Sequence, residues 1–173
     1  MRIFISIDIP QEIKKIVKEI QKNLPEFNGK KIEEENFHLT LKFLGEITEK
    51  DLDETKQKLS EINFKKFKAK LGDLGVFSEN FVRIVWIKIE NCDGLQKEID
   101  EKLSSVFPKE KRFMSHLTIA RIKSLKNKGA FLEGLKKINY ERKDFSVDKF
   151  FLNMSILTKE RAFYKRLENF FLE

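Results

Sequence analysis

The chain is poor in the residues that build covalent cross-links and metal centres. Among its 173 residues there are one cysteine, two histidines and three prolines. A lone cysteine, Cys92, excludes an internal disulfide and is typical of a reducing compartment such as the cytoplasm. These residues are also too few for a protein-built zinc site, so we expect neither a metal ion nor a cofactor.

Long apolar runs are missing as well. No stretch approaches the roughly 20 apolar residues that a membrane-spanning helix needs, and the alternating start of the chain is not a signal peptide. Hydrophobic residues nevertheless make up 40% of the chain, with 17 phenylalanines, which is enough for a buried core. We therefore expect a monomeric cytoplasmic protein, folded as a single domain over residues 1–173, without membrane contact.

The charge balance is basic. Lysine and arginine number 35 against 28 aspartate and glutamate residues, which gives a net charge of +7. This excess is consistent with a polyanionic partner such as RNA, although a solvated, lysine-rich surface would give the same total.

Both histidines of the chain lie in a His-Leu-Thr triplet. The first triplet belongs to residues 37–45, whose alternation predicts a strand with a polar and an apolar face. The polar face is expected to carry His38, Thr40 and Lys42. The buried face is expected to carry Phe37, Leu39, Leu41 and Phe43.

The second triplet repeats this arrangement in residues 115–121, where His116 and Thr118 share a face. Strict alternation places Arg121 on the opposite face. Arg121 therefore reaches the histidine side only if the strand ends or bulges after Thr118.

The predicted elements also occur twice in the same order. The histidines are 116 − 38 = 78 residues apart, and two predicted strands, 2–9 and 81–90, are offset by about the same interval. Each is followed by a helix, a connection, a histidine strand and a second helix; Thr48 and Asp51 form a predicted capping box. Further strands are predicted at 64–76, 144–157 and 163–172. The sequence thus predicts an α+β fold with two lobes related by a pseudo-twofold axis, each an antiparallel sheet flanked by helices, around a central cleft.

Two facing imidazoles suit acid–base catalysis. Because the pKa of free imidazole is roughly 6.5, one ring can be neutral and the other protonated near pH 7. The neutral ring can accept a proton from a nucleophile, while the protonated ring donates one to the leaving group. A threonine hydroxyl beside each ring can donate a hydrogen bond to an anionic oxygen. Such a set fits a phosphodiester, although Thr40 and Thr118 are also good strand formers.

Four segments resemble the two-histidine (2H) phosphoesterase superfamily, and more closely its RNA 2′,3′-cyclic phosphodiesterases, also called 2′-5′ RNA ligases. The segments are the opening strand Arg2–Pro10, the first motif Glu35–Glu46, the strand Val82–Trp86 and the second motif His116–Arg121. Two positions depart from the family pattern: Ser115 stands where proline is common, and Arg161 replaces a glycine before Tyr164.

The resemblance implies a metal-independent opening of a terminal 2′,3′-cyclic phosphate to a 2′-phosphate, and for some members the reverse, ATP-independent joining of RNA ends. It implies that His38 and His116 are the acid–base pair. Thr40, Thr118 and Arg121 would bind the phosphate. An RNA- or nucleotide-binding module without turnover and a two-histidine metal site are the alternatives.

Three further residues are candidate RNA contacts. Lys42 is expected on the histidine face, where it could equally be solvated. Arg83, beside Trp86 in the central strand, fits a structural role as well as RNA contact. Tyr164 belongs to the last predicted hairpin.

Overall fold

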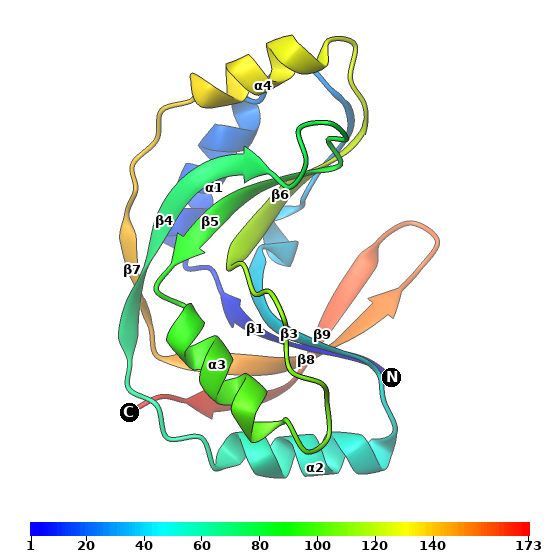
Figure 1. Cartoon of the computed structure of the whole chain (residues 1–173), viewed down its shortest axis with the longest axis vertical. Helices are drawn as coiled ribbons and strands as arrows, with labels where there is room; N and C mark the ends of the chain where they lie inside the picture. Colours follow the sequence, from blue (N-terminus) through cyan, green and yellow to red (C-terminus); the bar gives the residue numbers. More distant parts are fainter.

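The computed structural model describes residues 1–173 as an α+β fold of two antiparallel sheets and four α-helices (Figure 1). The strands are β1 (Arg2–Asp8), β2 (Asn28–Lys31), β3 (His38–Glu46), β4 (Phe67–Val76), β5 (Ile84–Glu90), β6 (His116–Ser124), β7 (Asp144–Val147), β8 (Lys149–Leu157) and β9 (Ala162–Phe171). The helices are α1 (Gln11–Lys22), α2 (Glu49–Ser60), α3 (Asp93–Lys102) and α4 (Lys128–Lys136), with a 3-10 turn, η1, at Glu34–Asn36.

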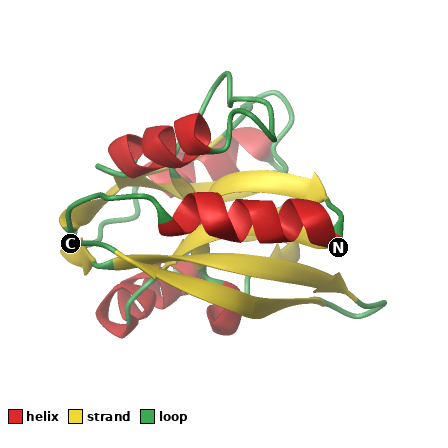
Figure 2. Ribbon diagram, turned by 90° about the horizontal axis from the view of Figure 1, so that it is seen from below, coloured by secondary structure: helices red, strands yellow, loops and turns green.

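The two sheets have corresponding strand orders, but the strands that end the two sequence repeats are exchanged: β4 lies in the sheet of β5 and β6, whereas β8 and β9 lie in the sheet of β1 and β3. One sheet runs β3-β1-β8-β9, and the other runs β6-β5-β4-β7 with β2 added outside β6. The histidine strands β3 and β6 thus occupy the same place in their sheets. The β8–β9 hairpin extends away from the body of the molecule (Figures 1 and 2).

The first helix of each half crosses to the sheet of the other half. Helix α1, which follows β1, packs on β6, while α3, which follows β5, packs on β3. The helices that follow the histidine strands pack on the same sheet as those strands: α2 packs on β9, and α4 packs on β4. A cluster of 34 buried hydrophobic residues includes members of both sheets and of all four helices. The two lobes are therefore built on a shared core.

Two segments differ from the sequence prediction. The segment at residues 25–35, expected to be a polar connection, contains β2 and the start of η1. All four residues of β2 are exposed, and the strand forms because its backbone pairs with β6. The strand expected at 144–157 is two strands that belong to different sheets: β7 pairs with β4, and β8 pairs with β1.

Candidate active site

A β-bulge interrupts β3 directly after its His-Leu-Thr triplet. Strand β1 pairs with Thr40 and then with Lys42, so that Leu41 has no opposing residue. The extra residue shifts the alternation by one position. As a result Lys42 turns into the protein, and Phe43 turns to the side of His38 and Thr40.

Strand β6 has a bulge at the corresponding place. Strand β5 pairs with Thr118 and then with Ala120, leaving Ile119 without an opposing residue. Arg121 thereby returns to the face of His116 and Thr118 and lines the same cavity as both of them. The geometry thus meets the condition under which Arg121 reaches the histidine side.

The expected position of Lys42 is wrong, for the same reason. Lys42 is 2% exposed, and its ammonium group donates to the carboxylate of Asp100 and to the carbonyl oxygen of Pro108, at 2.7 Å for the latter. It is therefore a buried residue that does not line the cavity of the histidines. Phe43, expected in the core, is 63% exposed.

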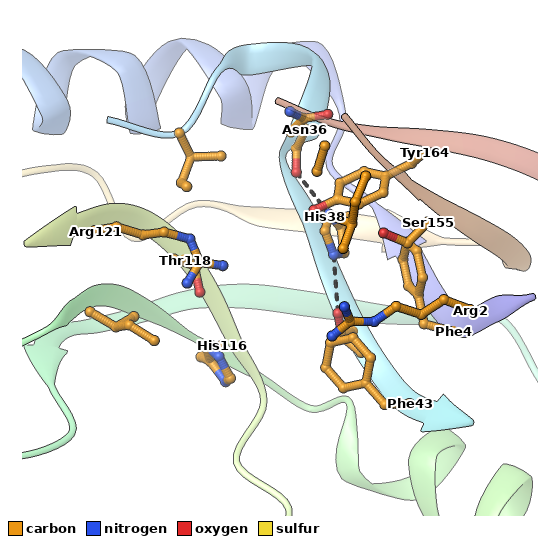
Figure 3. Close-up of a pocket in the computed structure, with 15 residues that line it drawn as sticks. Arg2, Phe4, Asn36, His38, Phe43, His116, Thr118, Arg121, Ser155 and Tyr164 are labelled. Atoms are coloured by element: carbon orange, nitrogen blue, oxygen red, sulfur yellow. Dashed lines mark hydrogen bonds between the residues drawn. The ribbon is translucent and has the colours of Figure 1, made fainter. Parts of the chain in front are cut away.

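The two lobes enclose a cavity of about 490 Å³ (Figure 3). Its lining includes both histidines, both threonines of the triplets, Arg121 and Tyr164. Arg2, Phe4 and Phe43 also line the cavity, and the sequence analysis did not select them. Arg2 and Phe4 alternate with Ile3 and Ile5 in β1, so alternation alone places them on one face, although Phe4 is only 3% exposed, with its ring against His38.

Each imidazole is oriented by the backbone two residues before it. Nδ1 of His38 lies 2.7 Å from the carbonyl oxygen of Asn36, and Nδ1 of His116 lies 2.7 Å from that of Met114. Because a carbonyl oxygen can only accept, Nδ1 carries the proton in both rings. Nε2 of each ring is therefore the atom left for a substrate.

The surroundings of His38 favour its neutral form. Its Nε2 lies 3.0 Å from Oγ1 of Thr40, where the hydroxyl donates to the unprotonated nitrogen. Burial lowers the pKa of His38; the Asn36 carbonyl and Asp8 act in the opposite direction, and the nearby His116 lowers it further. Near pH 7 this ring is thus a proton acceptor.

Aromatic rings fix both imidazoles from the side. The ring centroid of Tyr164 lies 4.9 Å from that of His38 in an edge-on arrangement, and Phe4 lies 5.1 Å from the same ring. On the other lobe, Phe77 meets His116 edge-on at 5.0 Å. These contacts restrict the rotation of the imidazoles.

Arg83 lies outside the cavity lining. Its guanidinium group donates to the carbonyl oxygens of Ile122 and Lys123, at 3.4 and 2.6 Å, and covers the ring of Phe81 at 4.1 Å. These bonds tie the start of β5 to the end of β6, which is a structural role. Trp86 has a similar role, since its ring packs against Gly75, where an added Cβ would lie 2.8 Å away.

The structure groups no three His, Cys, Asp or Glu residues in a way that could hold a metal ion. The polar side chains that meet in the cavity are imidazole, hydroxyl, guanidinium, amide and phenol groups, which are suited to an anionic ligand. None of the four helices has the length and apolar character needed to cross a membrane.

Comparisons with known proteins give a consistent result. The family model for LigT-like phosphoesterases matches residues 3–86. An RNA 2′,3′-cyclic phosphodiesterase of Methanocaldococcus jannaschii is 38% identical over 84% of this chain and 84% of the relative. One of the same name from Archaeoglobus fulgidus is 35% identical over 98% of this chain and 99% of the relative.

Solved structures show the same fold. The crystal structure of TT0787 from Thermus thermophilus superposes with a TM-score of 0.85 at 24% identity, covering 99% of this chain and 97% of the other. That of E. coli LigT complexed with 3′-AMP has a TM-score of 0.81 at 24% identity, with 99% and 97% coverage. The chain belongs to the LigT-like phosphoesterases of the two-histidine superfamily.

Proposed function

We propose that the protein is an RNA 2′,3′-cyclic phosphodiesterase that opens a terminal 2′,3′-cyclic phosphate to a 2′-phosphate. One observation carries the proposal: His38 and His116, each bound at Nδ1 to a backbone carbonyl, line one cavity with two threonines and Arg121. Relatives that carry this name at 34 to 38% identity support it.

His38 is the general base in hydrolysis, because burial lowers the pKa of its imidazole and so favours the neutral ring. It removes a proton from water as the water oxygen bonds to phosphorus. His116 is the general acid, and it protonates the ribose O3′ as the P–O3′ bond breaks. The phosphate remains on O2′, and two proton transfers balance the addition of water.

The remaining polar groups stabilise the charge on phosphorus. Thr40 gives up its bond to His38 and, with Thr118, donates to the non-bridging oxygens, where negative charge increases in the transition state. The Arg121 guanidinium group adds a fixed positive charge and paired N–H donors. These groups need no metal ion for hydrolysis. Joining of RNA ends would use the same proton transfers in the same direction: an RNA 5′-hydroxyl takes the place of water, the P–O3′ bond breaks, and a 2′-5′ bond remains, with each histidine in the same role.

The proposal extends to the form and location of the enzyme. A cavity made by both lobes of one chain contains the complete set of groups, so a monomer suffices for catalysis. The single free Cys92, which is buried, fits a reducing cytoplasm.

The test is an assay on an oligoribonucleotide with a 2′,3′-cyclic phosphate end, followed by mapping of the product phosphate. A 2′-phosphate formed by the wild-type protein, and lost in His38→Ala, is the expected result. Tight binding of the RNA without turnover would instead identify a binding module that kept the fold.

A further inference from the structure

The two bulges place different side chains at equivalent positions of the two lobes. Strand β1 pairs Phe4 with Phe43, just as β5 pairs Ile84 with Arg121. Phe43 and Arg121 are thus related by the pseudo-twofold and both line the cavity between the lobes. At this position one lobe presents the guanidinium group of Arg121 to the cavity, and the other presents an aromatic ring that is 63% exposed.

Phe43 also lines a second cavity, of about 650 Å³, between the end of β3 and the loop at residues 107–112. Phe43 therefore marks the junction between this groove and the cavity of the histidines. The loop contributes Lys109, Lys111 and Arg112 against the single carboxylate of Glu110, a net charge of 3 − 1 = +2.

Two of the three cations are free to meet a ligand. Lys109 pairs with Glu101 at 2.6 Å, whereas Lys111 and Arg112 are exposed and form no ion pair. An open aromatic face beside unpaired cations is the combination by which proteins bind single-stranded nucleic acid.

The loop that carries these cations is fixed to β3 by a buried ion pair. The ammonium group of buried Lys42 bonds the carboxylate of Asp100 and the carbonyl oxygen of Pro108, and the same carboxylate accepts from the backbone N–H of Glu110 at 2.9 Å. Lys42 directly precedes Phe43. The ion pair thus holds the two sides of the groove in register, which reduces the entropic cost of ordering them around a ligand.

We propose that this groove is the subsite for the RNA nucleotides that precede the terminal one. The base of the penultimate nucleotide stacks on Phe43, and Lys111 and Arg112 contact backbone phosphates further upstream. The inference rests on the proposed function, and adds to it that the preferred substrate is a single-stranded RNA end longer than one nucleotide.

A second basic strip borders the histidine cavity at the β2–β6 edge. Lys30 pairs with Arg121 across these strands, and Lys123 follows two residues later. The exposed aromatic ring near this strip, Phe81, has one face covered by Arg83 at 4.1 Å. Because the ring near the strip already stacks on a guanidinium group, whereas Phe43 contacts Phe4 at 6.0 Å and has no cation over its ring, the groove at Phe43 is the better fit to RNA.

The experiment compares kcat/KM for two substrates: a 2′,3′-cyclic mononucleotide and a short single-stranded oligoribonucleotide with the same terminal nucleotide. Phe43→Leu should lower the oligonucleotide value about 5- to 150-fold relative to the mononucleotide value, the worth of one stacked base. Phe43→Tyr, which keeps the ring, should retain the wild-type ratio of the two values.

The double variant Lys111→Ala/Arg112→Ala should also lower that ratio. Loss of two phosphate contacts should reduce the slope of log KM against log salt for the oligonucleotide by about 1.4, at roughly 0.7 per contact for a single strand. Lys136→Ala/Lys137→Ala on α4, at the opposite end of the molecule from the groove (Figure 1), is the matched charge control and should change neither quantity. Unchanged unfolding midpoints would show that each variant is folded.

Several outcomes would overturn the subsite. Equal losses on both substrates in Phe43→Leu would assign the ring to the terminal nucleotide. If Lys30→Ala/Lys123→Ala selectively lowered kcat/KM for the oligonucleotide and Lys111→Ala/Arg112→Ala did not, the RNA would instead run over the β2–β6 edge. If the wild-type enzyme turns over both substrates and every variant keeps the wild-type ratio of the two kcat/KM values, the subsite is refuted and the proposed function stands. If the wild-type protein turns over neither substrate, the proposed function is wrong, and the subsite with it.

Discussion

Replacing Lys42 tests whether this residue holds the fold or contacts RNA. In Lys42→Met, the carboxylate of Asp100 loses its ammonium partner and retains the backbone N–H of Glu110 as donor. The carbonyl oxygen of Pro108 loses its bond of 2.7 Å as well. The side chains of Lys42 and Asp100 are only 1% and 10% exposed, so water replaces these bonds poorly.

Removing one partner of a buried ion pair typically lowers the free energy of unfolding by about 3 to 5 kcal/mol. This is a large part of the roughly 5 to 15 kcal/mol that keeps a domain folded. For a chain of this size, each kcal/mol lowers the melting temperature by about 2 to 4 °C, so a decrease of about 6 to 20 °C is expected. Thermal unfolding followed by circular dichroism measures it.

Two further variants make the test specific. Lys42→Met/Asp100→Leu removes both charges and should recover much of the loss, because an apolar pair can replace a buried ion pair. Lys22→Met breaks an exposed pair with Glu19 on α1 and should lower the midpoint by a few degrees at most. If Lys42→Met melted at the wild-type temperature and bound RNA more weakly, the reasoning would be refuted and Lys42 would be an RNA contact.

Four predictions concern catalysis. His38→Ala and His116→Ala should each lower kcat about 10²- to 10⁴-fold with a much smaller change in RNA binding; near-normal turnover in either would contradict the pair. Thr40→Ala and Thr118→Ala should cost up to roughly 10²- to 10³-fold per folded molecule, and a loss of stability alone would leave them as strand formers. The pH–rate profile should be bell-shaped. Because burial lowers the pKa of His38, the rate should fall with decreasing pH only below roughly 6.5. A flat profile, with chemistry shown to be rate-limiting, would exclude the two histidines as the acid–base pair. Activity should survive an excess of chelator, whereas loss and recovery with a divalent ion would require another mechanism.

Local patterns in the sequence were sufficient for the main elements. The apolar stripe of α1 is buried at Ile13, Val17 and Ile20, as its spacing predicts. The capping box of α2 is present, with Thr48 and Asp51 each bonding the backbone N–H of the other. Such patterns work because helix faces and caps depend on residues within a few positions of one another.

Strand pairing without a side-chain signal could not be predicted. Strand β2 has four exposed residues, among them Lys30 and Lys31, and is a strand because the edge of β6 offers it backbone partners. Similarly, β7 and β8 are separated by Asp148 alone, and their assignment to different sheets depends on distant strands. The sequence of these segments does not determine which strand each of them pairs with.

The bulges show why a motif can be located from sequence while the residues just after it are misplaced. Up to Thr40 and Thr118, alternation holds in both histidine strands, and these side chains do share a cavity. One extra residue in each strand then reverses the faces, which buries Lys42, exposes Phe43 and brings Arg121 to the cavity. The shift depends on pairing with β1 and β5, so no pattern within the strand itself reveals it. The two lobes share the bulge but carry different residues after it. The His-Leu-Thr triplets of the two lobes are therefore nearly symmetric, whereas the equivalent positions after them carry a guanidinium group in one lobe and a phenyl ring in the other. In the proposed complex with RNA, this difference gives the strand its direction across the cleft.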